Sequence, residues 1–142
     1  MAEEKKIGAI KEELQAAEDS MLPDFIARYE KDERSGVKSL VEKAGKRIQK
    51  LEAEYARIEN LKKYEKEYAD AGYICGIDEV GRGPLAGPVV AGAVILPKDC
   101  DILYINDSKK LSASMREKLY DEIMEKAVAT GIGMAGPGRI DE

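Results

Sequence analysis

Two adjacent carboxylates followed by a glycine-rich turn are the part of this sequence most suited to chemistry. Asp78 and Glu79 come directly after the short apolar run 73–77, which has the length and composition of a buried strand. The turn at 81–83, Gly-Arg-Gly, contains two glycines that can adopt positive φ and leave backbone N–H groups uncovered. Carboxylate oxygens bind hard divalent metals, and uncovered amides bind phosphate or sugar oxygens. The stretch therefore predicts a site for a divalent metal and a phosphate or sugar group.

The sequence contains no histidine, which excludes Ser-His-Asp and Cys-His nucleophiles, imidazole zinc sites and histidine general bases. Catalysis then has to use carboxylates, lysines, hydroxyls or a bound metal. The two cysteines, Cys75 and Cys100, have no metal-type spacing, and we expect both to be reduced and structural in a cytoplasmic protein. With 44% apolar and 36% charged residues and no long apolar run, the composition is that of a soluble protein without a membrane span or signal peptide.

Strands must position the acid pair. Neighbouring side chains on a regular strand point to opposite faces, so both acids can bind one metal only if the strand ends or bulges there. The glycine two positions after the pair is placed to allow that bend.

The β-branched run 89–96 predicts a second, buried strand. Ser114 and Glu117 predict a capping box that starts a helix, Gly131 is expected to end this helix, and a third strand is expected over 132–135.

The first part of the sequence predicts helices. Apolar residues recur at helical spacing over 5–20, and a short helical turn is expected at 25–29. Ser35 is the predicted N-cap of the longest helix, whose apolar positions step by fours and threes from Val37 to Ile58.

The distribution of charge leaves two interpretations of this long helix open. The net charge of −5 argues against a nucleic-acid partner, because phosphate binding draws most of its affinity from Lys and Arg. Between residues 34 and 50, however, six basic residues stand against a single acid. The helix is either a coiled-coil or packing seam with a solvated charged face, or its basic stripe contacts a nucleic-acid backbone. The basic stripe consists of Lys43, Lys46, Arg47 and Lys50.

Three longer strings occur in a specific order: GIDEVGRGPLAGPVVAGAVILP, LYINDSKKLSASMREKLYDEI and GIGMAGPGRIDE. Together they resemble the first part of the catalytic domain of the ribonuclease HII family, and PDFIARYEKDERSGVKSLVEK is similar to the N-terminal extension of some members. The resemblance implies a metal-dependent endonuclease with Mn²⁺ or Mg²⁺ as cofactor. Its substrates would be the RNA strand of RNA–DNA hybrids and single ribonucleotides embedded in a DNA duplex, cleaved to leave 5′-phosphate ends during DNA replication and repair.

The resemblance also assigns roles to residues. Asp78 and Glu79 match the first two of the family's four metal-binding carboxylates, which makes them the candidate catalytic residues. The N-terminal extension is implied to help hold the hybrid, which favours the nucleic-acid interpretation of the basic stripe. The segment 107–110 can also be a helix lead-in with exposed lysines. The residues implied to bind the ribose 2′-hydroxyl and phosphates are Gly81, Arg82, Gly83, Ser108, Lys109 and Lys110.

The family's third and fourth carboxylates, both aspartates, match positions beyond the last residue of this sequence. We therefore expect a truncated or split gene product, little or no cleavage by this chain alone, and a complementing C-terminal fragment as a partner. The expected fold class is α/β: a helical region at 1–70, followed at 71–142 by an incomplete ribonuclease H-like mixed sheet with a flanking helix. Gly72 is the expected C′ residue at this boundary.

Alternatives from other classes remain. The chain can be a nucleic-acid-binding helical module without catalysis, or a structural helical adaptor. Gly81, Gly83 and Ala86 also fit the form of a dinucleotide-binding fingerprint. That fingerprint requires a helix at the glycines, whereas Pro84 and Pro88 flank the turn and a strand follows at once.

Overall fold

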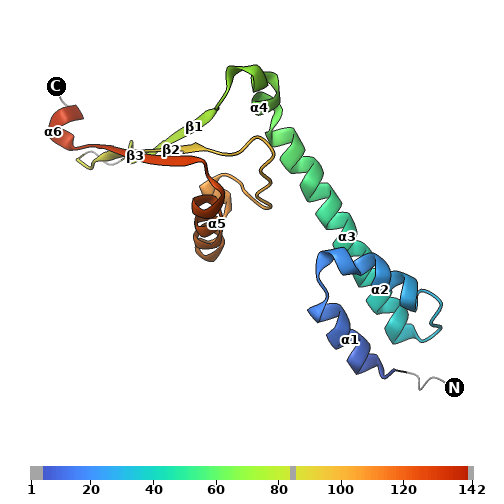
Figure 1. The fold of residues 1–142 in the computed structure, drawn as a ribbon. Helices are drawn as coiled ribbons and strands as arrows, with labels where there is room; N and C mark the ends of the chain where they lie inside the picture. The colour runs from blue at the N-terminus through green and yellow to red at the C-terminus, as the bar shows by residue number, and fades with distance from the viewer. Residues whose placement is uncertain (1–4, 84–85, 141–142) are drawn as a thin grey trace. The chain divides into compact units, whose positions relative to one another are not determined.

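The computed structural model describes residues 5–83 and 86–140 (Figure 1). Its contacts divide the chain into two compact units, Met1–Arg57 and Ile58–Glu142. This division falls inside the longest helix, whereas the sequence places a domain boundary near residue 70, and that boundary stays a prediction. Pro84, one of the two prolines beside the glycine turn, lies outside the described residues.

Three helices form the first unit around one apolar core. They are α1 (Ile7–Ala16), α2 (Leu22–Tyr29) and α3 (Ser35–Leu61), and the 3₁₀ turn η1 (Asp19–Met21) precedes α2. The apolar residues at helical spacing lie in this core, as expected of amphipathic helices. The first helix is shorter than the predicted range 5–20. The core residues are Ile10, Leu14, Leu22, Phe25, Tyr29, Val37, Leu40 and Ala44.

Helix α1 is joined to α2 by packing and by one carboxylate. The rings of Phe25 and Tyr29, one turn apart on α2, have centroids 4.9 Å apart in a tilted arrangement. The Tyr29 hydroxyl donates to Glu13 Oε2 of α1 at 2.8 Å. Glu13 also accepts hydrogen bonds from the charged side chains of Lys5 and Arg28. These bonds lower the pKa of the Glu13 carboxyl, and the bond from Lys5 has the largest effect. The pairs are partly exposed, so the apolar contacts carry most of the stability.

Arg34 closes the turn between α2 and α3. Its Nε donates to Asp32 Oδ1 at 2.9 Å, and this guanidinium lowers the pKa of the Asp32 carboxyl to about 2. Its Nη1 donates to the backbone carbonyl of Lys5 at 3.0 Å, although the two residues lie 29 positions apart. Arg34 therefore holds the start of α1 against the start of α3. Ser35, the predicted N-cap, is instead the first residue of α3, because the Arg34 carbonyl already accepts from the Lys38 amide at 3.0 Å.

The second unit contains a three-stranded antiparallel sheet. Strands β1 (Cys75–Val80), β2 (Val89–Ile95) and β3 (Ala129–Ala135) lie in the order β1-β2-β3, so β2 is central. Helix α5 (Ala113–Lys126) connects β2 to β3 (Figure 1). Short elements complete this unit: α4 (Lys63–Glu67), η2 (Ala69–Ala71), η3 (Ser108–Lys110) and α6 (Pro137–Ile140). The predicted α/β class, helices followed by a sheet with a flanking helix, is confirmed, and the described sheet is antiparallel throughout rather than mixed.

Predicted boundaries around α5 are wrong. The N-cap is Ser112, whose hydroxyl oxygen accepts from the Met115 amide at 3.3 Å, and not a capping box at Ser114 and Glu117. The helix ends at Lys126, because the chain turns to extended geometry at the next residue. Gly131, expected to end the helix, is instead the third residue of β3.

Few side chains of the second unit are buried. Among its described residues, the buried apolar set comprises Ile58, Ile102 and Leu119. An ion pair between Lys62 and Asp101 fastens the loop after β2 to the end of α3, and the Lys126 ammonium donates to the Asp101 carbonyl at 3.0 Å.

Gly72 ends η2 with φ of 92°, as expected of a residue at this junction. Of the helices that the structure describes, none combines the length and the apolar composition needed to cross a bilayer.

Phe25 provides a test of the three-helix core. Its side chain is 3% exposed, so Phe25→Ala removes a buried ring and is expected to lower the free energy of unfolding of the first unit by about 3–5 kcal/mol. Urea unfolding followed by amide hydrogen exchange would report this unit separately. Met21→Ala, at a side chain that is 50% exposed, is the control and should change stability by less than about 0.5 kcal/mol. Equal effects of the two variants would contradict this core.

Candidate functional site

Asp78 and Glu79 lie inside β1, not after its end. The register of β1 on β2 is unbroken, with Asp78 opposite Gly92 and Glu79 opposite Ala91, so the predicted strand 73–77 and the predicted bend at the pair are both wrong. A regular pleat directs the two side chains to opposite faces of the sheet. Asp78 Oδ1 accepts from the Glu79 amide at 2.9 Å, which leaves its other oxygen without a partner among the described hydrogen bonds. The acid pair is therefore adjacent in sequence but divided between two faces.

Small neighbours leave both carboxylates accessible. Asp78 has a glycine as its cross-strand neighbour, and a Cβ added at Gly92 would meet no atom within 4 Å. Glu79 has Ala91 opposite, and Ala91 in turn pairs with Gly133 of β3. Both acids are exposed. The residues directly opposite the two acids on β2 are therefore a glycine and an alanine.

The bend expected at the acid pair occurs at Gly81. This residue has φ of 99°, and a Cβ built on it would lie 2.2 Å from the Pro88 carbonyl oxygen, so only glycine fits this position. Gly83 has open space around it and no positive φ. Arg82 Nη1 lies 3.4 Å from Glu79 Oε1, and its side chain is 78% exposed. The turn therefore carries an exposed cation directly behind the acid pair.

The donors fit a hard divalent ion in kind but not in number. Carboxylate oxygens are the ligands that Mg²⁺ and Mn²⁺ prefer, and Mg²⁺ is commonly held by one or two carboxylates with water and phosphate oxygens in the other positions. In the described part of the chain, no group of three or more Asp, Glu or Cys side chains is arranged to hold a metal. Asp78 and Glu79 can therefore supply part of a site, with further ligands coming from elsewhere.

Residues 108–110 form the exposed turn η3. The Asp107 carboxylate caps it by accepting from the Lys109 amide at 2.9 Å. Arg116, one turn into α5, donates from Nη1 to the carbonyls of Leu111 at 2.7 Å and Ser108 at 3.3 Å. Arg116 fixes this turn and was missed by sequence reasoning, because nothing local marks a long-range bond to backbone. No described hydrogen bond or ion pair joins η3 to the acid pair.

Two members of the basic stripe on α3 are engaged by acids. Arg47 pairs with Asp19 at 2.7 Å, and Lys46 pairs with Glu42 at 2.6 Å. Lys43 and Lys50 are exposed, and neither has a partner among the described ion pairs. On a helix of 3.6 residues per turn, both lie on one flank of the helix, roughly 80–100° around the axis from the buried Leu40 and Ala44. The stripe is therefore solvent-facing, with two unpaired lysines.

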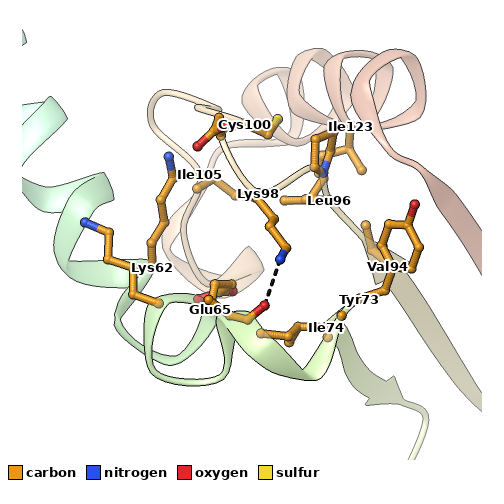
Figure 2. Close-up of a pocket in the computed structure, with 16 residues that line it drawn as sticks. Lys62, Glu65, Tyr73, Ile74, Val94, Leu96, Lys98, Cys100, Ile105 and Ile123 are labelled. Carbon is orange, nitrogen blue, oxygen red and sulfur yellow. Dashed lines mark hydrogen bonds between the residues drawn. The ribbon is translucent and has the colours of Figure 1, made fainter.

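A separate pocket of about 430 Å³ lies in the second unit (Figure 2). Apolar side chains such as Val94 and Ile123 line it, and the Lys98 ammonium donates across it to the Ala69 carbonyl at 2.7 Å. Neither Asp78 nor Glu79 belongs to the lining, so the pocket is not part of the acid-pair site. Sequence reasoning missed it because its walls come from segments far apart along the chain.

Family models match both parts of the chain. The model described as "Ribonuclease HII N-terminal domain" matches residues 6–69, and the model described as "Ribonuclease HII" matches residues 75–136. The chain belongs to the ribonuclease HII family. The acid pair, the Gly81 turn and η3 all fall within the second match.

Curated relatives named Ribonuclease HII resemble nearly the whole chain. That of Lachnoclostridium phytofermentans is 58% identical over 137 residues, covering 96% of this chain and 54% of the relative. That of Enterococcus faecalis is 49% identical over 144 residues, covering 100% of this chain and 56% of the relative. The solved "Crystal structure of the ribonuclease H2 from Pyrococcus horikoshii OT3" matches 49% of this chain and 35% of its own, at 30% identity and a TM-score of 0.40. The chain spans about half the length of these curated ribonuclease HII relatives.

Gly81→Ala tests whether the turn behind the acids depends on this glycine. Positive φ alone costs an alanine about 1–3 kcal/mol, and the contact with the Pro88 carbonyl forces the ends of β1 and β2 apart. We expect faster amide exchange in both strands and a lower free energy of unfolding of the second unit. Gly83→Ala, which places the same methyl group in open space, is the matched control and should stay within about 0.5 kcal/mol of the parent. Similar amide exchange rates in the two variants would refute the close approach of the Pro88 carbonyl to Gly81.

Proposed function

We propose that this chain forms part of a metal-dependent endonuclease that cleaves the RNA strand of RNA–DNA hybrids and single ribonucleotides in duplex DNA, leaving 5′-phosphate ends. The observation that carries the proposal is the pair of exposed carboxylates, Asp78 and Glu79, directly before a turn that only glycine can make, within the segment matched by the ribonuclease HII model. The relatives' name, Ribonuclease HII, supports the same class of reaction. Cytoplasmic location and a role in DNA replication and repair belong to the proposal.

Asp78 and Glu79 are the proposed metal ligands and catalytic residues. Asp78 offers the oxygen that does not accept from the Glu79 amide, and Arg82 at 3.4 Å restrains the Glu79 carboxylate. Bound Mg²⁺ or Mn²⁺ would supply activation of a water molecule and stabilisation of the leaving oxygen. The open space at Gly92 leaves room for a phosphate beside Asp78. Further carboxylates are required, because two acids on opposite faces do not enclose an ion.

The Gly81 turn and η3 are the proposed substrate contacts. Gly81, Arg82 and Gly83 would approach the ribose and phosphate closely, since two of the three lack a side chain. Ser108, Lys109 and Lys110 would contact phosphates, with Arg116 holding the turn through the Ser108 carbonyl. Arg82, Gly83 and residues 108–110 are exposed, as contacts to a large polymer require.

A complementing polypeptide segment is part of the proposal. The curated relatives are about twice as long as this chain, and the site here has two carboxylates. A segment in the same or another polypeptide would supply the further acids. The chain by itself is then expected to cut a hybrid carrying one ribonucleotide little or not at all with Mn²⁺ present. Clean cutting 5′ to that ribonucleotide would contradict the need for further ligands.

Asp78→Asn tests the metal site directly. Mn²⁺ is paramagnetic, so a titration followed by NMR should broaden the amide signals near residue 78 first, with a dissociation constant of about 1 mM or weaker because few ligands are present. The substitution removes the charge but keeps the size, and we expect binding at this place to weaken about tenfold or more. Asp121→Asn, an exposed carboxylate on α5, is the matched control and should leave the broadening unchanged. Broadening that persists in Asp78→Asn would place the metal elsewhere.

The second candidate function is hybrid binding through the helical unit without catalysis. The unpaired, solvent-facing Lys43 and Lys50 favour it. Lys43→Glu with Lys50→Glu should weaken binding of an RNA–DNA hybrid by the full chain and reduce the slope of log affinity against log salt by about two, since each phosphate contact contributes roughly 0.9. Lys11→Glu with Lys31→Glu makes the same charge change away from α3 and should reduce the slope less. Equal losses would indicate a non-specific charge effect.

A further inference from the structure

The turn η3 is shaped by hydrogen bonds and not by packing. Every residue of 106–110 is exposed, so burial of apolar surface does not fix the path of the chain there. Instead, the Asn106 side chain accepts from the Asp107 amide at 2.9 Å, and the Asp107 carboxylate accepts from the Lys109 amide at 2.9 Å. The Lys110 amide donates to the Asp107 carbonyl at 2.9 Å. Asp107 therefore takes part in three of the bonds that shape this turn.

The backbone is also constrained on both sides of this turn. Before it, Tyr104 has φ of 67°, the one positive φ among the described residues other than glycine. Such a conformation costs free energy and persists where the surrounding structure determines it. After the turn, Arg116 Nη1 donates to the carbonyls of Ser108 at 3.3 Å and Leu111 at 2.7 Å. The two lysines of η3 are therefore presented from one defined backbone path.

The charge of Asp107 opposes the binding of a polyanion. Its carboxylate precedes Lys109 and Lys110 in a turn that is proposed to contact phosphates. A carboxylate at such a place repels phosphates and lowers the local positive potential. None of the described ion pairs involves Asp107 or either lysine. The structural role of this acid therefore lies in its bonds to the backbone, and not in the neutralisation of a neighbouring cation.

We propose that Asp107 is a positioning residue for substrate binding: by capping η3, it sets the backbone from which Lys109 and Lys110 contact phosphates of the hybrid. The inference rests on the proposed function, in which this turn is a substrate contact. It predicts a result that charge alone does not. Removal of this acid together with its capping oxygen should weaken the binding of a polyanion, because the lost cap outweighs the lost repulsion.

Asp107→Ala and Asp107→Asn separate the cap from the charge. Both variants remove the negative charge, but asparagine keeps an oxygen that caps as well as that of aspartate. Fluorescence anisotropy would measure the binding of a labelled RNA–DNA hybrid to the full chain. The dissociation constant should rise about threefold or more in Asp107→Ala and stay equal or fall in Asp107→Asn. Faster exchange of the Lys109 amide should accompany the alanine variant alone.

Glu125→Ala is the matched control for charge. It removes an exposed carboxylate from α5, away from η3, and should leave the dissociation constant of the hybrid equal or slightly lower. Circular dichroism checks that all variants keep the fold.

A double-mutant cycle tests whether Asp107 acts through the lysines. Lys109→Gln with Lys110→Gln should weaken hybrid binding and lower the slope of log affinity against log salt by up to about two. Added to this pair, Asp107→Ala should no longer weaken binding, because the groups that it positions are absent. A parent chain that does not bind the hybrid, or binds it equally without the two lysines, would refute the proposed substrate contact itself.

The positioning role fails separately when the lysines do matter. Tighter binding in Asp107→Ala, an equal loss in Asp107→Asn, or a loss that persists without the two lysines would each overturn it.

Discussion

The antiparallel register of β1 on β2 determines what the acid pair can do. Asp78 pairs with Gly92 and Glu79 pairs with Ala91 in an unbroken ladder, and the pleat of such a regular strand sends two adjacent carboxylates to opposite faces. The same register places the smallest side chains of β2 beside the acids, so neither carboxylate is covered. A register shifted by one residue would exchange the faces of both acids and put Val90 opposite Glu79. Access to the acids therefore depends on this register, whereas their separation follows from their adjacent positions on an unbroken strand.

The sequence predicted what local periodicity and local chemistry determine. The helical period predicted a helix over 5–20, and the structure places Ile10 and Leu14 of this range in the core, because a 3.6-residue repeat puts them on one side of α1. Gly81 was expected at the bend and adopts positive φ there. The strand boundary failed for a physical reason: an apolar run marks a buried strand, whereas β1 is exposed along its length and continues through two acids to Val80. At α5, the sequence predicted Ser114 as the cap, whereas the structure has Ser112, a serine two positions earlier, because the backbone geometry of the turn decides which hydroxyl reaches the first amides.

Long-range contacts could not be predicted from the sequence. Arg47 belonged to the predicted basic stripe, but Asp19, from the turn before α2, neutralises it at 2.7 Å. Arg116 fixes η3 through backbone carbonyls, which every residue possesses and no sequence pattern identifies. The same limit applies to Lys62 and Asp101, which are 39 positions apart. Local patterns place residues on faces of elements, whereas the partner that changes a residue's availability comes from another element.

The small core of the second unit gives the charges of its sheet a larger role. With Ile58, Ile102 and Leu119 as the buried apolar residues described there, the sheet keeps exposed apolar side chains that water contacts unfavourably. Any covering element gains from that surface, so apolar area alone does not select a partner. The carboxylates on β1 oppose an added strand unless cations neutralise them, and the neutral β3 has no such barrier. The two edges therefore differ in charge, because β1 carries two carboxylates and β3 carries no charged side chain.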